Sequence, residues 1–193
     1  MTIVWMCLIA YLVGSVSPGL LIGKYFYHKD IRNYGSGNLG ATNTFRVLGR
    51  NAGIVVTLLD MAKGVIGALL PLLFHSDVHG IIVGLFAVLG HVFSIFLKFK
   101  GGKAVATSAG VVLAVNPVLF ILTAIAFFSV LYAFKYVSLA SILASIINFI
   151  AAVPFGDWII TGISFIIMVI VIVRHRANIS RIMNHEEPKI KWM

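Results

Sequence analysis

Long apolar segments separated by short polar segments run through the whole chain. A helix needs about 20 mostly apolar residues to cross the hydrocarbon core of a bilayer. The first candidate segment covers residues 3–22, the second starts near Ala52 and ends at His75, and the third runs from about His79 to Leu97. The pattern therefore predicts three membrane-spanning helices in the first half of the chain.

The rest of the chain stays apolar from Ala104 to Val173, apart from three short breaks at 116–117, 135–136 and 154–157. These breaks leave four pieces, of which 104–115 is too short to span and is expected to borrow residues from the preceding glycine loop. Seven spanning helices therefore fit best. Five spanning helices are the alternative. They rank second because they require two long, strongly kinked helices in this region.

Lysine and arginine alternate between the ends of the predicted helices. Every one of them except Lys63 lies in the segments 24–51 and 98–103, at residue 135, or in the tail from residue 174. Because loops rich in these residues stay on the cytoplasmic side, the pattern predicts an outside N-terminus, a cytoplasmic C-terminus and an odd number of spans. The loops at about 24–51 and 98–103 and the tail 174–193 then share one face.

Composition supports a single integral membrane domain over residues 1–193, an all-α polytopic helical bundle. The chain is 60% hydrophobic and only 11% charged, whereas soluble domains are about a quarter charged. The basic segments are short and lie between apolar ones, so no nucleic-acid partner is expected. Cys7 is the only cysteine, which excludes a disulfide within one chain. No base precedes the first apolar segment, so we expect it to be retained rather than cleaved.

Residues 36–46 form the first candidate site, with the sequence Ser-Gly-Asn-Leu-Gly-Ala-Thr-Asn-Thr-Phe-Arg. Hydroxyl and amide side chains accompany Arg46, whose guanidinium can bind an oxyanion through two parallel hydrogen bonds. This composition favours recognition of a small phosphorylated ligand. The alternative is a turn followed by a helix that is capped by Thr42 or Asn43.

Residues 99–108 form the second candidate site, Phe-Lys-Gly-Gly-Lys-Ala-Val-Ala-Thr-Ser. Exposed N–H groups of Gly101 and Gly102, together with the dipole of the following helix, are expected to hold an anion. The spacing of a nucleotide-binding P-loop is absent, so a nucleoside triphosphate is not implied. The alternative is a pair of lysines that anchor lipid headgroups, which leaves the paired glycines unexplained.

Residues 174–181, Arg-His-Arg-Ala-Asn-Ile-Ser-Arg, follow the last apolar segment directly. On a helix, His175 and Asn178 share a face because they are three residues apart. The polar pair on one face indicates a third candidate site. The alternative is an ordinary basic stop at the membrane surface.

Four further candidate residues lie inside the apolar segments. Asp60 and Lys63 are three residues apart and can pair, and ionisable groups at membrane depth are typically functional sites or internal pairs. His91 lies toward the inner end of its segment, where a hydrogen bond between helices is expected. Ser141 shares one side of a later helix with two other serines; such residues commonly pack helices, and it is retained as a candidate ligand contact.

Two other classes of membrane protein fit less well. A transporter or channel is typically built from internal repeats with ionisable residues through the membrane depth, and the chain shows no convincing repeat. A lipid phosphatase needs a nucleophilic or histidine-based pair that the sequence does not show. His75, Asp77 and His79 have no further partner nearby for a metal ion, so we expect neither a metal nor another cofactor.

Taken together, the three sites resemble the acyl-phosphate-dependent glycerol-3-phosphate acyltransferases, the membrane enzymes that begin bacterial phospholipid synthesis. The resemblance rests on residues 36–43 with Arg46, on residues 100–107 and on residues 174–179. Residues 60–64 also resemble the DxxKG element of that family. The order, spacing and length agree over essentially the whole chain.

The resemblance implies transfer of a fatty acyl group from acyl phosphate to the 1-hydroxyl of sn-glycerol 3-phosphate. The products are lysophosphatidic acid (1-acyl-sn-glycerol 3-phosphate) and inorganic phosphate. It also implies that no acyl-enzyme forms and that a substrate phosphate accepts the hydroxyl proton. We expect a multi-pass monomer in the bacterial cytoplasmic (inner) membrane, in contact with both substrates and with membrane lipid.

Residue roles follow from the three sites as a hypothesis. The catalytic candidates are Ser36, Arg46, Lys103, His175 and Asn178. Substrate binding is assigned to Asn38, Thr42, Asn43, Lys63, Gly101, Gly102 and Ser141, and a supporting role to Asp60 and His91. Within this scheme one group holds glycerol 3-phosphate (Arg46, Lys103, His175 and Asn178 with the two glycines), and the other orients the acyl phosphate (Ser36, Asn38, Thr42 and Asn43).

The tail departs from the family pattern at one point. The family usually has a glycine two residues before a glutamate, whereas Asn184 precedes His185 and Glu186 here. Asparagine adopts the left-handed conformation more readily than most residues, so we expect a preserved turn at Asn184. The departure puts the role of Glu186 in question.

Overall fold

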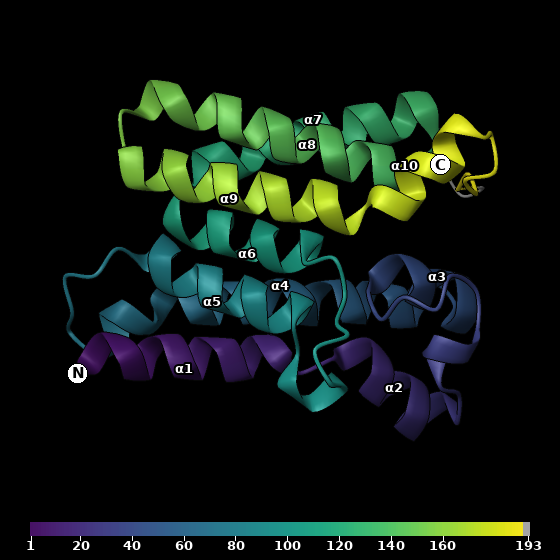
Figure 1. Ribbon diagram of the computed structural model, residues 1–193, viewed down its shortest axis with the longest axis horizontal. Helices are drawn as coiled ribbons and strands as arrows, with labels where there is room; N and C mark the ends of the chain where they lie inside the picture. The colour runs from purple at the N-terminus through teal and green to yellow at the C-terminus, as the bar shows by residue number, and fades with distance from the viewer. Residues whose placement is uncertain (191–193) are drawn as a thin grey trace. The chain divides into compact units, whose positions relative to one another are not determined.

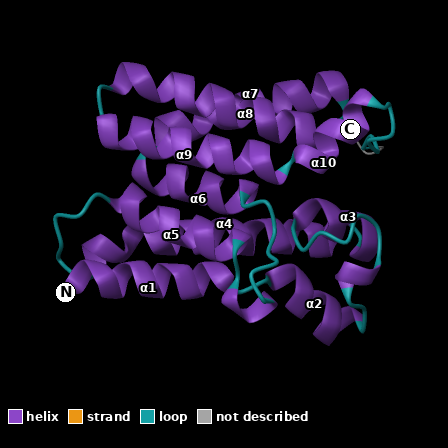
Figure 2. Ribbon diagram, in the orientation of Figure 1, coloured by secondary structure: helices purple, strands orange, loops and turns teal. Residues whose placement is uncertain are grey.

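The computed structural model describes residues 1–190 as α-helices, short 3-10 turns and loops, with no strand among them (Figures 1 and 2). The prediction of an all-helical chain is therefore confirmed over these residues. The chain divides into two compact units, residues 1–115 and residues 116–193. The prediction of a single domain stays a prediction.

The first unit contains six helices: α1 (Thr2–Ser15), α2 (Pro18–Tyr27), α3 (Ala41–Leu48), α4 (Arg50–Leu73), α5 (Gly80–Val92) and α6 (Val105–Val115). The predicted first helix is broken at Val16 and Ser17. Pro18 is the physical cause, since the residue before a proline is pushed out of the α region, and Ser17 has φ −109° and ψ 94°. Together α1 and α2 still form one apolar stretch, Thr2–Tyr27.

Helices of the first unit approach one another closely at small residues. A Cβ atom on Gly64 of α4 would collide with the carbonyl oxygen of Thr107 in α6, and one on Gly110 of α6 would collide with that of Met61 in α4. Backbones packed this closely exclude larger side chains, as is typical of helix pairs in membranes. The positions of α4 and α6 relative to each other are therefore fixed by backbone contact.

The second unit contains α7 (Pro117–Phe134), α8 (Val137–Ala152), α9 (Trp158–Arg174) and α10 (Arg176–Met183). The Asn116 side chain accepts a hydrogen bond from Leu119 N–H at the start of α7, and the Asp157 side chain caps α9 in the same way. Asn148 of α8 donates to Ser164 of α9 and accepts from Thr123 of α7. This buried polar cluster ties the three long helices of the unit together.

Among the described residues, five segments are long and apolar enough to cross a membrane: Thr2–Tyr27, Arg50–Leu73, Gly80–Leu97, Pro117–Phe134 and Val137–Phe155. A sixth is obtained when α9 and α10, which meet at an angle of 56°, are counted as one bent span. Helix α6 has only 11 residues and starts at Val105. The expectation that it borrows residues from the glycine loop is wrong, and the seven-span count and the orientation stay predictions.

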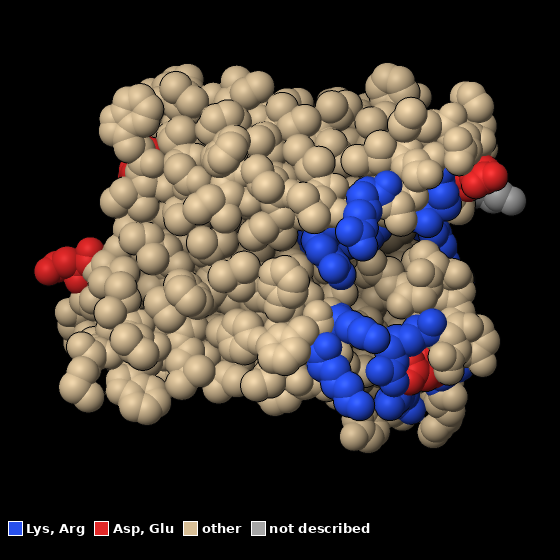
Figure 3. All heavy atoms as spheres, viewed as in Figure 1, with Lys and Arg blue, Asp and Glu red and all other residues tan. Residues whose placement is uncertain are grey.

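Positive charge is concentrated at one end of the helices in each unit (Figure 3). In the first unit these are the ends that connect to the loops 24–51 and 98–103, because α4 and α6 begin there and α5 ends there. The loops carrying the candidate residues are therefore next to the basic ends of the helices. Acidic groups in Figure 3 lie both at the opposite end of the helices and among the basic groups, where Asp30 pairs with Lys24 and Arg32 and Glu187 pairs with Arg181.

Candidate active site

The first polar loop is folded around the side chain of Asn43, which is only 1% exposed. Its amide nitrogen donates to the carbonyl oxygens of Ile31 (3.0 Å) and Tyr34 (3.1 Å), and its amide oxygen accepts from Ser36 N–H (2.9 Å). Gly35 has φ +60°, and a Cβ atom there would collide with the same amide oxygen. Asn43 thus positions Ser36, and the side chain of Ser36 itself is exposed.

An ion pair closes the start of the same loop. The Asp30 carboxylate accepts hydrogen bonds from Nε of Arg32 (2.9 Å), from its Nη2 (2.6 Å) and from its backbone N–H (3.1 Å). The side-chain hydrogen bond from Arg32 lowers the pKa of Asp30 to about 2. The carboxylate therefore stays ionised above that pH, and one acidic charge in this basic loop is already neutralised by its neighbour.

Helix α3 presents Arg46 beyond this loop. The Asn38 side chain accepts from Gly40 N–H (3.0 Å) and turns the chain into α3. The helix begins at Ala41 with Gly40 as its N-cap and without a side-chain cap. The alternative in which Thr42 or Asn43 caps the helix is therefore wrong, and the Arg46 side chain extends from α3 in an exposed position.

The second polar loop is bound to the end of α5 through its glycines. Gly101 N–H donates to the carbonyl of Val92 and Gly102 N–H to that of His91, both at 3.0 Å. The last carbonyl groups of a helix have no hydrogen-bond partners inside the helix. Here the N–H groups of the two glycines are their partners. The expectation that these two N–H groups are open to an anion is therefore wrong.

The groups of this loop that are suited to an anion lie one step further along the chain. Lys98, Phe99 and Ala104 adopt left-handed φ angles of 51°, 62° and 56°, and such backbone strain is typical of functional loops. Helix α6 begins directly after Ala104, so its first N–H groups point into the loop without partners in the helix. Lys103, which is half-buried, precedes this helix start and adds a positive charge.

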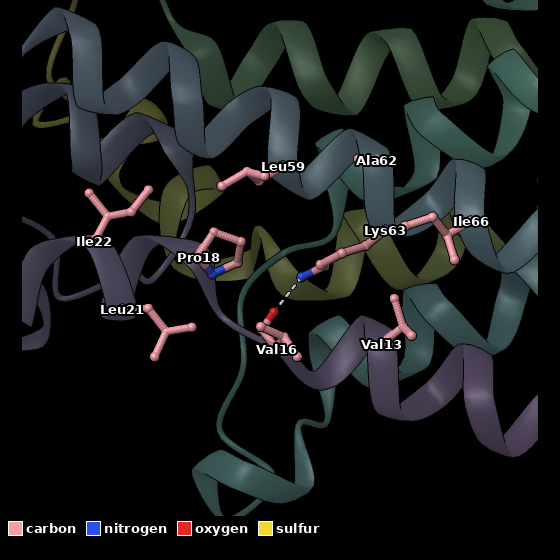
Figure 4. Close-up of a pocket in the computed structure, with 9 residues that line it drawn as sticks. All are labelled: Val13, Val16, Pro18, Leu21, Ile22, Leu59, Ala62, Lys63 and Ile66. Atoms are coloured by element: carbon pink, nitrogen blue, oxygen red, sulfur yellow. Dashed lines mark hydrogen bonds between the residues drawn. The ribbon is translucent and has the colours of Figure 1, made fainter. Parts of the chain in front are cut away.

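Asp60 and Lys63 pair inside the first unit, as predicted, with 2.9 Å between Nζ and Oδ1. The ammonium group also lies 2.9 Å from Nδ1 of His91 and donates to the carbonyl of Val16 at 2.8 Å. Figure 4 shows this last bond at the edge of an apolar cavity of about 410 Å³ between α1, α2 and α4. The assignment of Lys63 to substrate binding stays a prediction.

His175 lies at the break between α9 and α10 in the second unit and is 3% exposed. Its Nδ1 lies 2.8 Å from the carbonyl oxygen of Val171, which can only accept, so Nδ1 carries a proton. In the neutral ring the other nitrogen, Nε2, is then a hydrogen-bond acceptor. The helix break thus gives His175 a defined orientation and tautomer.

Asn178 is held by an acidic residue that the sequence did not single out, Glu187. The Glu187 carboxylate accepts from Asn178 (2.7 Å) and Ser138 (2.8 Å) through Oε1 and from Arg181 (2.8 Å) through Oε2. Burial raises the pKa of Glu187, but the hydrogen bonds from Asn178, Arg181 and Ser138 outweigh it and hold the pKa below its ordinary value. Glu187 therefore positions Asn178 and joins the tail to α8.

The turn before Glu187 is shifted by one residue from its predicted place. His185, not Asn184, has the left-handed conformation, with φ values of 60° and −89° respectively. Glu186 N–H donates to the carbonyl of Arg181 and His185 N–H to that of Ile182, which is the Schellman pattern of a helix end. The spacing of a turn residue two positions before a glutamate therefore fits His185 and Glu187, and Glu186 is exposed.

Replacing His185 with glycine is expected to stabilise the protein by about 0.5–1 kcal/mol. A non-glycine residue in the left-handed conformation costs roughly 1–2 kcal/mol, which the glycine removes. Glycine also gives the unfolded chain more conformational freedom, and this offsets a part of the gain. Thermal unfolding in detergent micelles measures the effect. Asn184→Gly is the matched control, and a greater stabilisation by this control would contradict the shifted turn.

Ser141 of α8 is 3% exposed and donates to the carbonyl of Val137, one turn earlier in the same helix. Its assignment to substrate binding stays a prediction. Within residues 1–190, no group of three or more His, Cys, Asp or Glu side chains is arranged to hold a metal ion. His79 instead caps α5 through Ile81 N–H.

The helices and loops define a class of protein: an all-helical membrane protein with basic loops suited to an anionic ligand. Comparison with known proteins then gives the family. The model of the family "Glycerol-3-phosphate acyltransferase" matches residues 4–185, and the chain belongs to this family.

Relatives and solved structures match over nearly their whole length. Glycerol-3-phosphate acyltransferases of Staphylococcus haemolyticus and Macrococcus caseolyticus are each 57% identical, over 100% of this chain and 100% and 99% of theirs. The crystal structure of PlsY, an integral membrane glycerol 3-phosphate acyltransferase, in its glycerol 3-phosphate form is 37% identical with a TM-score of 0.93. It matches over 99% of this chain and 96% of that one. The crystal structure of its lysophosphatidic acid form is 36% identical to this chain with a TM-score of 0.90, over the same shares of the two chains. The predicted integral membrane fold is thus confirmed.

Proposed function

We propose that this protein transfers a fatty acyl group from acyl phosphate to the 1-hydroxyl of sn-glycerol 3-phosphate. Lysophosphatidic acid and inorganic phosphate are the products. The observation that carries the proposal is the loop of residues 98–104, where Lys103 and the start of α6 offer positive charge next to a membrane-embedded helix pair. Family membership supports the same substrate.

The proposed chemistry needs little from the protein beyond binding and charge. Acyl phosphate is a mixed anhydride, so its phosphate is already a good leaving group. The 1-hydroxyl oxygen forms a bond to the carbonyl carbon, the bond from that carbon to the phosphate oxygen breaks, and the hydroxyl proton passes to a substrate phosphate. The protein holds the two substrates in line and stabilises the oxyanion that forms on the carbonyl.

Residues of the first unit are proposed to act on both substrates. Lys103, with the first N–H groups of α6, binds the phosphate of glycerol 3-phosphate, and Arg46 adds a bidentate contact. Ser36 and Thr42 orient the acyl phosphate. Asn43 contributes through the loop that it holds, since its amide groups are already bonded to the backbone.

The second unit is proposed to contribute a polar pair of its own to ligand binding, His175 and Asn178. The Nε2 atom of neutral His175 can accept a hydrogen bond from a hydroxyl group, because Nδ1 donates to Val171. Asn178 is held ready by Glu187. Their buried, pre-ordered side chains suit a contact that must be made in one geometry.

The proposed topology has seven spans, namely α1 with α2, then α4, α5, α6, α7, α8 and α9, in the bacterial cytoplasmic membrane. An outside N-terminus puts the loops 24–51 and 98–103 and the tail on the cytoplasmic side, where lysine and arginine are retained. Glycerol 3-phosphate then reaches the protein from the cytosol. Acyl phosphate, an amphiphile, reaches it from the lipid.

An assay with purified protein tests the donor. Detergent-solubilised protein is incubated with radiolabelled glycerol 3-phosphate and, separately, palmitoyl phosphate, palmitoyl-CoA or palmitoyl-acyl carrier protein. We expect labelled lysophosphatidic acid from palmitoyl phosphate only, with one inorganic phosphate released for each ester. An equal amount of product from palmitoyl-CoA would contradict the proposal that acyl phosphate is the donor. Release of phosphate without formation of an ester would indicate a phosphatase.

A further inference from the structure

A buried polar cluster in the first unit lies against the loop that carries Lys103. It consists of Asp60 and Lys63 from α4, His91 from the end of α5 and Thr107 from the first turn of α6. All four side chains are buried, with exposed fractions from 0% to 9%. Burying polar groups among membrane helices costs free energy unless each group has a partner. The contacts that these four side chains make therefore indicate the role of the cluster.

The hydrogen-bonding partners of Lys63 determine the tautomer of His91. The Lys63 ammonium can only donate. It donates to Val16 O (2.8 Å), lies 2.9 Å from His91 Nδ1, and forms an ion pair with Asp60 Oδ1 at 2.9 Å. Nδ1 of His91 also lies 3.4 Å from Asp60 Oδ1, but its shorter contact is with the Lys63 ammonium, and this contact is a hydrogen bond only when Nδ1 is the acceptor. The ring proton is therefore on Nε2, on the opposite side of the imidazole.

The Nε2 side of the ring faces Gly102. A Cβ atom added to Gly102 would collide first with Nε2 and then with the adjacent ring carbons of His91. The carbonyl oxygen of His91 also accepts the hydrogen bond from Gly102 N–H at 3.0 Å. The side chain and the backbone of one residue thus hold the glycine that immediately precedes Lys103.

Thr107 links the same ring to the other end of the loop. Its hydroxyl oxygen lies 3.1 Å from His91 Nδ1, and Thr107 belongs to the first turn of α6, whose N–H groups open into the loop. The imidazole therefore contacts the loop both before and after Lys103. Both anion-binding parts of the loop, the lysine and the helix start, take their positions from it.

We propose that His91 is a positioning residue for anion binding at Lys103, and that Lys63 and Asp60 act by fixing its tautomer and ring orientation. The inference rests on the proposed function in one respect: the anion is taken to be the phosphate of glycerol 3-phosphate. A displaced imidazole ring shifts the loop and with it Lys103. Because binding depends on precise placement of the charged group, even a small shift is expected to weaken the binding of glycerol 3-phosphate greatly. Binding of the acyl donor does not depend on this contact.

Isothermal titration of glycerol 3-phosphate into purified protein, with no acyl donor present, tests this role without turnover. His91→Asn keeps an acceptor near the Nδ1 position but removes the ring from Gly102, and is expected to raise Kd at least about tenfold. Lys63→Met removes the donor to Nδ1 and is expected to raise Kd to a similar extent. Asn148→Ala, in the buried polar cluster of the second unit, is the control: it lowers thermal stability but leaves Kd unchanged.

A double variant separates positioning from general damage to the fold. Gly102→Ala alone is expected to raise Kd because its methyl group displaces the ring. Combined with His91→Ala, which removes that ring, the same glycine variant should have little additional effect, so the two changes are not additive. Steady-state kinetics should show a raised KM for glycerol 3-phosphate and an unchanged KM for acyl phosphate.

Two results would overturn the proposal: a wild-type Kd in His91→Asn, or additive effects of the His91 and Gly102 changes. Failure of the proposed function has a different signature. A wild-type protein that binds glycerol 3-phosphate but forms no ester with acyl phosphate would contradict the acyl transfer, while the comparison of Kd values would still decide the role of His91.

Discussion

Replacing Lys103 with alanine is expected to lower kcat/KM for glycerol 3-phosphate about a hundredfold or more, while the protein remains folded. The side chain is half-buried and lies next to the start of α6, where, under the proposed function, the phosphate loses water and gains a charge-assisted hydrogen bond. Removing one partner of such a contact costs about 2–5 kcal/mol, and each 1.4 kcal/mol corresponds to about a tenfold change.

Initial rates over a range of glycerol 3-phosphate concentrations measure this loss. Lys29→Ala is the matched control, because it removes one exposed positive charge from the other basic loop of the same unit. The control is expected to stay within about twofold of wild type, since exposed charges contribute little. Near wild-type kinetics in Lys103→Ala, or equal losses in the two variants, would contradict the assignment of the phosphate to this loop.

Replacing Glu187 with alanine is expected to lower the free energy of unfolding by about 3 kcal/mol and to abolish activity. The change leaves Asn178, Ser138 and Arg181 without the carboxylate that all three contact. Buried polar groups deprived of a charged partner lose about 1–3 kcal/mol each, and the effects are not fully additive. Glu186→Ala, one residue earlier and exposed, is expected to change stability by less than about 0.5 kcal/mol.

The pH dependence of Glu187 provides a second measurement. Its pKa is lowered on folding, so its stabilising contribution is present above the ordinary glutamate pKa and is lost as the pH falls through the lowered folded value. Thermal unfolding of wild type should therefore lose stability on acidification, and Glu187→Gln should lose less. Equal destabilisation by the changes at 186 and 187 would contradict the contacts of the tail.

Local sequence patterns predicted the features that local physics determines. Apolar length located most of the helices, and the spacing of Asp60 and Lys63 predicted their ion pair, because residues three apart on a helix are neighbours. The break before Pro18 was missed, although the proline itself was the available signal. The bases in the loops indicated which helix ends carry the polar sites.

Features that depend on contacts distant in sequence could not be predicted. The N–H groups of Gly101 and Gly102 were expected to be open, but their partners are carbonyls at the end of α5. The importance of Glu187 depends on Ser138, 49 residues earlier. The left-handed residue is a local feature that was predicted one position too early, because α10 ends so that His185 and not Asn184 follows its C-cap. Asn43 was assigned to substrate, whereas folding gives its amide to the loop backbone.

Acyl transfer from acyl phosphate to glycerol 3-phosphate, with cleavage between the carbonyl carbon and the bridging oxygen, is tested most directly with an oxygen isotope. Palmitoyl phosphate labelled with ¹⁸O in the oxygen that bridges carbon and phosphorus is mixed with glycerol 3-phosphate and purified protein. If the 1-hydroxyl attacks the carbonyl carbon, the bridging oxygen leaves with the phosphate, and each molecule of lysophosphatidic acid is matched by one labelled inorganic phosphate. Unlabelled phosphate, or labelled phosphate without any ester, would contradict the mechanism.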